Sequence, residues 1–163
     1  MANGLSPSGS NGPVMLEPGD PAPDVSAPNQ RGESVTPDFA APTVLFFYPE
    51  DFTKGCTAEA AEFQELYADF RELGVAVYGA SMDGVERHAD FAEAEGLTFD
   101  LLADPDGTVA EAFGVSTDRD YADRRTFLIG DGRVRETYAP NPAGHAAVVL
   151  SDARDAFGGA RGR

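Results

Sequence analysis

Short apolar runs and amphipathic segments follow one another along the chain. Residues 43–48 are apolar without a charged interruption, a pattern typical of a strand that is covered on both faces. Residues 57–73 carry apolar side chains every three or four positions, which predicts an amphipathic helix. Pro49 is expected to end the strand and Gly74 the helix, because proline cannot donate to a sheet and glycine readily closes a helix.

Shorter runs of the same kind predict the rest of the domain. Residues 75–81 and 101–103 are mostly apolar and are expected to form strands. Between them, Asp83 is expected to cap a helix that ends at Gly96. We expect an extended edge segment over residues 17–25 and a turn over residues 29–33. Two further helices are expected over residues 109–113 and 142–157, and a hairpin over residues 125–138.

Strands and helices alternate along most of this pattern, and a hairpin follows near its end. That order predicts an α/β sandwich, in which helices flank a central mixed β-sheet with a parallel core and an antiparallel end. A length of 163 residues suits one domain, which we place at residues 14–158. Residues 1–13 are mostly Gly, Ser, Asn and Pro and predict a disordered tail, and residues 159–163 are expected to form a flexible tail.

The net charge of the chain argues against some classes of binding partner. The chain has 12 Lys and Arg against 28 Asp and Glu, a formal net charge of −16, and Lys54 is its only lysine. Such a field repels nucleic acid and anionic membrane surfaces, so neither is an expected partner. An ordinary acidic surface that aids solubility is one explanation. We favour a halophilic protein, because repulsion of this size needs a salt-rich medium to screen it.

The location is predicted from the distribution of apolar and basic residues. No apolar run approaches the ~20 residues that span a bilayer. The first residues lack the basic and apolar regions of a secretory signal. We therefore expect a cytoplasmic protein.

The single cysteine, Cys56, lies where the first strand meets the first helix. The N–H groups and the positive dipole at the start of a helix favour an anion, so a thiol there ionises more easily and becomes nucleophilic. Thr53 precedes it by three residues, so a tight turn would bring its hydroxyl near the sulfur, and Pro49 is expected to shield the site from water. The alternative is a buried cysteine that acts as a small hydrophobic residue.

The spacing Pro49-x-x-x-Thr53-x-x-Cys56 resembles the active-site motif of the peroxiredoxins. The surrounding Phe-Tyr-Pro-x-Asp-Phe-Thr-x-Gly-Cys-Thr resembles the subfamily of bacterioferritin-comigratory proteins, also called peroxiredoxin Q. The resemblance covers about residues 16–157 and implies a thioredoxin-like fold. It also implies that the Cys56 thiolate attacks hydrogen peroxide or an organic hydroperoxide and becomes a sulfenic acid. Thr53 and the N–H groups near Gly55 would bind the peroxide, without a metal or an organic cofactor.

Residues 124–129, Arg-Arg-Thr-Phe-Leu-Ile, resemble a second motif of the same family, which implies that Arg124 is the catalytic arginine. Strand alternation independently places Arg124 and Arg125 on opposite faces, so only one should reach the thiolate. Glu59 follows Cys56 by three residues on the helix and is expected to orient Arg124 through a bidentate pair. Exposure on the helix surface is the alternative for Glu59.

The chain departs from its subfamily at Ala61, because many members carry a resolving cysteine there, five residues after the reactive one. One cysteine also excludes an intrachain disulfide, a Cys-x-x-Cys exchanger and a multi-cysteine metal site. We therefore expect a one-cysteine peroxidase, a monomer or homodimer, whose sulfenic acid is reduced by an external thiol or a thioredoxin-like protein.

Two other functions are alternatives to peroxidase activity. A thiol redox sensor or holdase would use the same reactive cysteine without turnover. A Cys–His hydrolase would need His88 or His145 within hydrogen-bond reach of the thiol, and no motif implies that. Asp104 and Asp106 are expected to cap a helix rather than bind a metal.

Overall fold

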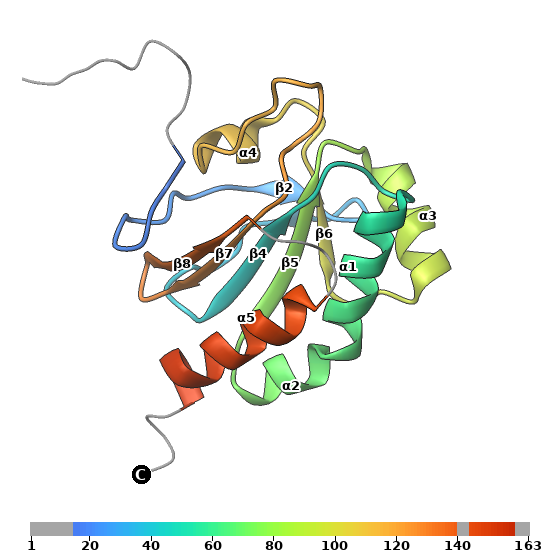
Figure 1. The fold of residues 1–163 in the computed structure, drawn as a ribbon. Coiled ribbons are helices and arrows are strands. Elements are labelled where there is room, and N and C mark those ends of the chain that lie inside the picture. Colours follow the sequence, from blue (N-terminus) through green and yellow to red (C-terminus); the bar gives the residue numbers. More distant parts are fainter. Residues whose placement is uncertain (1–14, 140–143, 159–163) are drawn as a thin grey trace, which may run out of the picture.

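A mixed sheet of five strands forms the centre of the molecule in the computed structural model, which describes residues 15–139 and 144–158 (Figure 1). The strands lie in the order β6, β5, β4, β7, β8. β4 is parallel to β5 and β5 to β6, whereas β7 is antiparallel to β4 and to β8. The prediction of a parallel core with an antiparallel end is confirmed. The strands are Asp100–Ala103 (β6), Ala76–Ser81 (β5), Thr43–Phe47 (β4), Arg125–Gly130 (β7) and Arg133–Tyr138 (β8).

Helices cover both faces of this sheet (Figure 1). Four of them bury side chains in one cluster and so share a face, namely α1 (Lys54–Glu65), α2 (Tyr67–Glu72), α3 (Val85–Glu95) and α5 (His145–Ala153). The opposite face is covered by α4 (Thr108–Ala112) and by a two-stranded antiparallel hairpin of β2 (Ala27–Pro28) and β3 (Ser34–Val35). That hairpin encloses the turn predicted at residues 29–33.

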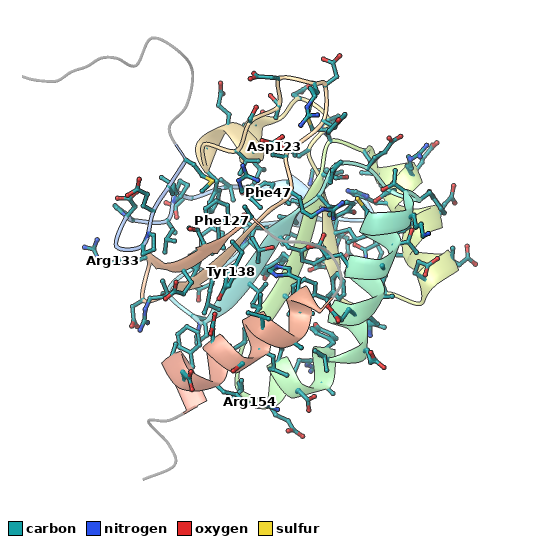
Figure 2. The ribbon with its side chains drawn as sticks, in the orientation of Figure 1. Phe47, Asp123, Phe127, Arg133, Tyr138 and Arg154 are labelled. Carbon is teal, nitrogen blue, oxygen red and sulfur yellow. The ribbon has the colours of Figure 1, made fainter. Side chains whose placement is uncertain are left out.

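β4 is the central strand, since it pairs with β5 on one side and β7 on the other. Both of its faces are covered, and all five of its side chains are buried. Val44 and Phe46 join the cluster formed with α1, α2, α3 and α5. Leu45 and Phe47 join a second cluster on the face of α4. There Phe47 packs edge-on against Phe127 of β7, with 5.9 Å between the ring centroids (Figure 2). The continuous apolar run in the sequence reflects this two-sided burial.

The prediction of a single helix over residues 57–73 is wrong in two respects. The helix begins earlier, at Lys54, and it is divided at Leu66, where the backbone (φ −97°, ψ 4°) leaves the helical range. The bend packs Phe70 of α2 against Phe63 of α1, with 5.9 Å between the ring centroids. Packing in the core therefore outweighs the propensity for one straight helix.

The prediction that Asp83 caps α3 is wrong. Gly84 occupies the N-cap, and no side chain caps the helix. The Asp83 carboxylate instead accepts the backbone N–H of Asp51 at 2.9 Å and the hydroxyl of Ser81 at 2.5 Å. The prediction fails because Asp51 lies 32 positions away, where local spacing does not reveal it, and because Ser81, two positions before Asp83, also binds the carboxylate. Gly96 ends α3 in the left-handed conformation, as predicted.

Asp104 caps α4, in agreement with the sequence analysis. Its two carboxylate oxygens accept the backbone N–H groups of Val109 and Ala110 at 2.9 and 3.0 Å. These N–H groups lie in the first turn of α4 and have no partner within the helix, so the carboxylate supplies one.

Some predicted segments fall outside the described ranges. These are the tails at residues 1–13 and 159–163 and the start of the last helix at Pro142. Within the described ranges, α5 begins at His145 and continues after Ala153 as a π-helical turn over Arg154–Gly158. None of the helices described for residues 15–139 and 144–158 is both long and apolar enough to cross a bilayer.

Candidate active site

The loop after β4 leaves the carboxyl edge of the parallel strands and enters α1. Thr53 is the N-cap of α1 and Cys56 is its third residue, so the thiol lies in the first turn; the sequence predicted a place in or just before that turn. The first intrahelical hydrogen bond runs from the N–H of Thr57 to the carbonyl of Thr53 at 2.8 Å. The N–H groups of Lys54, Gly55 and Cys56 precede it, and such groups favour an anion. Cys56 is 1% exposed.

Arg124 reaches the thiol from the residue just before β7. Its Nη2 donates to Cys56 Sγ at 3.4 Å, and its Nη1 donates to Glu59 Oε1 at 2.6 Å. Arg125 turns away, because its guanidinium donates to the carbonyl of Arg124 at 2.8 Å and lies 3.8 Å from the carboxylate of Asp123. The two arginines therefore diverge as strand alternation predicted, with Arg124 on the side of the sulfur.

Glu59 is fully buried behind Arg124. The alternative prediction for this residue, exposure on the helix surface, is therefore wrong. The expected bidentate pair does not form either, since Nη2 of Arg124 turns to the sulfur. Within the described part of the chain, Oε2 of Glu59 has no hydrogen-bond partner, and it lies 3.9 Å from Nε2 of His145. Burial raises the pKa of Glu59 to about 7, although the charge of Arg124 lowers it. The charge of this carboxylate therefore changes near neutral pH.

Both histidines lie deep in the fold and hydrogen-bond to groups other than the thiol. Nε2 of His145 lies 2.8 Å from the hydroxyl of Thr126. Burial, and then the charge of Arg124, lower the pKa of His145 to about 4, so its imidazole is neutral at neutral pH. Nδ1 of His88 lies 2.6 Å from the carboxylate of Asp51. Neither arrangement supplies the thiol–imidazole contact that a Cys–His hydrolase requires.

The other predicted site residues lie on the loop and in the first turn. Thr53 is exposed, and its hydroxyl donates to the carbonyl of Glu50 at 2.9 Å, which leaves the hydroxyl oxygen able to accept. Pro49 is half-buried directly after Tyr48, and Gly55 is half-buried next to Cys56. The structure thus joins Cys56, Arg124 and Glu59 by direct contacts, whereas Thr53, Pro49 and Gly55 are placed beside them by the chain.

A buried network that sequence reasoning missed holds the same loop. Asp51 is fully buried, and its carboxylate binds both the hydroxyl of Tyr48 and the imidazole of His88 at 2.6 Å. Asp51 was visible in the sequence only as part of a motif. His88 lies 37 positions further on, in another helix, so no local pattern connects the two residues.

Oxygen and nitrogen atoms of Asp51, Asp83 and His88 lie within 4.8 Å of one another, a spacing that would suit a metal ion. These atoms already bind one another, the Tyr48 hydroxyl and neighbouring backbone groups. The donors and acceptors are therefore satisfied without an ion, and the cluster fits a structural network better than a metal site.

The chain is similar to a well-defined group of known proteins. The model of the AhpC/TSA family matches residues 18–137. A peroxiredoxin Bcp of Bacillus subtilis is 36% identical over 153 residues, which cover 87% of this chain and 98% of the relative. A peroxiredoxin Bcp of Escherichia coli K12 is 37% identical over 147 residues, which cover 83% of this chain and 94% of the relative.

Solved structures agree with these relatives. The crystal structure of peroxidoxin BcpB from Mycobacterium tuberculosis matches with a TM-score of 0.80 at 34% identity and covers 86% of this chain and 98% of its own. A bacterioferritin comigratory protein of Xanthomonas campestris, described for its alkyl peroxide reduction activity, matches with a TM-score of 0.77 at 28% identity. That match covers 89% of this chain and 99% of the other.

Proposed function

The chain belongs to the AhpC/TSA family, with the thioredoxin-like fold of the Bcp and peroxiredoxin Q proteins, and we propose that Cys56 alone carries its thiol-dependent peroxidase activity. The observation that supports this most is the contact of 3.4 Å between Nη2 of Arg124 and Sγ of the only cysteine. A guanidinium keeps its charge at any working pH, so it stabilises a thiolate beside it.

The helix start and Arg124 together favour the reactive form of Cys56. The first N–H groups of α1 and its dipole add to the positive charge of the guanidinium, and both attract a negative charge on the sulfur. Pro49, half-buried at the start of the loop, limits the access of water to the sulfur. A desolvated thiolate beside fixed positive charge is a stronger nucleophile than a solvated thiol.

The reaction is a two-electron oxidation of the sulfur. The thiolate attacks the terminal oxygen of the peroxide, an S–O bond forms and the O–O bond breaks. Cys56 becomes a sulfenic acid, and the departing hydroxide or alkoxide takes a proton and leaves as water or an alcohol. Arg124 stabilises the negative charge that develops on the departing oxygen, while Thr53 and the N–H groups of Gly55 and Cys56 position the peroxide.

The reductant must come from outside the chain, because Ala61 stands where a resolving cysteine would be and no other cysteine is present. An external thiol attacks the sulfenic sulfur and releases water, which leaves a mixed disulfide that a second thiol reduces. Since Cys56 is 1% exposed, the first turn of α1 must open to admit that thiol. A thioredoxin-like protein is the partner we propose, and it acts on a monomer or a homodimer.

We also propose that the enzyme works in a salt-rich cytoplasm. Its net charge of −16 produces self-repulsion that concentrated salt screens. The same charge argues against nucleic acid and anionic membranes as partners.

Coupled peroxide consumption tests the function. We expect the wild-type protein to consume hydrogen peroxide repeatedly with dithiothreitol as the reductant, and the matched variant Cys56→Ser to consume none. A thiol sensor would be oxidised at Cys56 without sustained turnover, so a reaction that stops after one equivalent would favour the sensor over the peroxidase.

A further inference from the structure

Asp51 is held at all of its polar atoms, although it lies in a loop and is fully buried. The hydroxyl of Tyr48 donates to Oδ1, and Nδ1 of His88 lies by Oδ2, both at 2.6 Å. The backbone N–H of Asp51 donates to Asp83 at 2.9 Å, and its carbonyl accepts from Arg87 at 3.1 Å. A loop residue held at every polar atom fixes the backbone on either side of it.

The Asp51 carboxylate and the His88 imidazole share one proton. Nε2 of His88 lies 3.0 Å from the carbonyl oxygen of Leu102, which only accepts, so Nε2 carries a hydrogen. A second proton must lie in the contact between Nδ1 and Asp51, since two bare acceptors 2.6 Å apart would repel. Burial raises the pKa of Tyr48 well above its ordinary value, so its hydroxyl stays protonated and donates. Removing Asp51 would therefore leave buried polar groups unpaired.

Phe52, the next residue, has a backbone conformation that bulky residues avoid. Its φ of 70° lies in the left-handed region. Phe52 is 47% exposed, and its ring packs edge-on against Phe91, with 5.2 Å between the centroids. The guanidinium carbon of Arg87 lies 5.5 Å from the ring centre. Strained backbone persists only where its surroundings hold it, and it gathers at functional sites.

We propose that Asp51 is a positioning residue of the peroxidase reaction, which holds Phe52 in the left-handed conformation and thereby sets Cys56 against Arg124. This inference rests on the proposed function of Cys56. Phe52 directly precedes Thr53, the N-cap of α1, and the cysteine is the third residue of the helix. A relaxed φ at Phe52 would turn the loop relative to α1 and loosen its first turn. The contact of 3.4 Å between the guanidinium and the sulfur would then be lost.

Two substitutions at Asp51 separate its hydrogen bonds from its charge. Asn in Asp51→Asn can still accept from Tyr48 and donate to Nδ1 of His88, so the rate of Cys56 oxidation by peroxide should stay within about threefold of wild type. Asp51→Ala has neither bond, and the strain at Phe52 should relax, with a loss of about tenfold or more. Stopped-flow oxidation gives these rates, and the thermal melting temperature checks the fold.

Second-site changes at Phe52 test the strain itself. Glycine adopts a positive φ freely whereas alanine does not. The double variant Asp51→Ala/Phe52→Gly should therefore recover most of the lost rate, and the matched Asp51→Ala/Phe52→Ala, which equally lacks the ring, should not. Equal recovery by both would show that the ring and not the backbone matters, which would overturn the proposal. An Asp51→Ala variant as fast as wild type would also overturn it.

A milder variant serves if Asp51→Ala does not fold. Tyr48→Phe keeps the ring and removes one of the bonds to Asp51, so it should slow Cys56 in the same direction and be rescued by Phe52→Gly but not by Phe52→Ala. The pH dependence of Cys56 alkylation by iodoacetamide is a second readout that needs no peroxide. If wild type consumes no peroxide, the proposed function fails. If alkylation profiles are the same in wild type and in the Asp51 or Tyr48 variant, the positioning role fails by itself.

Discussion

The guanidinium of Arg124 donates to the buried carboxylate of Glu59 over 2.6 Å. The other end of the same group donates to the Cys56 sulfur at 3.4 Å. Arg124 therefore divides its charge between a carboxylate and the reactive thiol. A negatively charged Glu59 holds the guanidinium in place and also competes with the thiolate for it.

Loss of Arg124 should slow peroxide reduction much more than loss of its neighbour. Arg124→Ala removes the donor to Sγ, so we expect a rate of Cys56 oxidation lower by about a hundredfold. Arg125→Ala is the matched control, because that side chain binds the carbonyl of Arg124 and lies near Asp123. Stopped-flow oxidation across a range of pH measures both. Equal losses, or the reverse order, would contradict the assignment.

The buried charge of Glu59 should make stability fall as pH rises toward neutral. Burial raises the pKa of Glu59 from 4.5 to about 7. The folded protein therefore keeps a proton that the unfolded chain releases over this window, and the free energy of unfolding decreases with pH by about 3 kcal/mol. Glu59→Gln carries no titrating group there, so its stability should depend less on pH.

Urea unfolding of the two proteins at about pH 5 and about pH 8 measures this difference. Glu65→Gln is the control, since Glu65 is exposed on the same helix and its loss makes the same change in charge. A pH dependence of stability that is the same in Glu59→Gln and in wild type would remove Glu59 as its source.

The place of Cys56 and that of Arg124 were each predictable because each follows from a local pattern, although the two residues lie 68 positions apart. Helix periodicity placed Cys56 in or just before a first turn, and strand alternation separated Arg124 from Arg125, so each step needed only neighbouring residues. The family motif then joined the two segments. The burial of Glu59 could not be predicted, because a carboxylate on a helix is exposed or buried according to what packs on that face.

The rest of the site depends on contacts between distant segments. Asp51 and His88 meet across 37 positions, and Asp83 was assigned to a helix cap when its carboxylate binds the loop instead. The bend at Leu66 follows from packing among aromatic rings. In each case a tertiary contact outweighs the local preference that the sequence displays.

A cysteine in place of Ala61 should form a disulfide with Cys56 only if α1 unwinds locally. Residues five apart in an α-helix have Cα atoms about 8.7 Å apart, beyond the reach of a disulfide. A disulfide between these positions therefore requires the first turns of α1 to unwind. After one equivalent of peroxide, we expect Ala61→Cys to form this intrachain disulfide and to have a lower melting temperature than the reduced protein. Mass spectrometry and thermal unfolding measure both. A persistent sulfenic acid in this variant would show that the first turns of α1 do not open.

Salt should stabilise the fold at neutral pH. The net charge is −16, and the Debye length falls from ~30 Å at 0.01 M salt to ~3 Å at 1 M, so repulsion among carboxylates is screened. We expect the melting temperature to rise with potassium chloride, and this dependence to shrink near the sequence pI of 4.2. A melting temperature that is constant between ~0.05 and ~2 M salt would contradict the halophilic proposal.

The most direct test is the fate of Cys56 after one equivalent of hydrogen peroxide in the absence of reductant. A one-cysteine peroxidase should consume the peroxide rapidly and carry a single sulfenic acid at Cys56. In one sample dimedone should trap this group, and in a second sample without dimedone an added thiol should restore turnover. Mass spectrometry of the trapped protein identifies the site. Peroxide consumption at an undiminished rate in Cys56→Ser, or a wild-type thiol that stays reduced, would contradict the account.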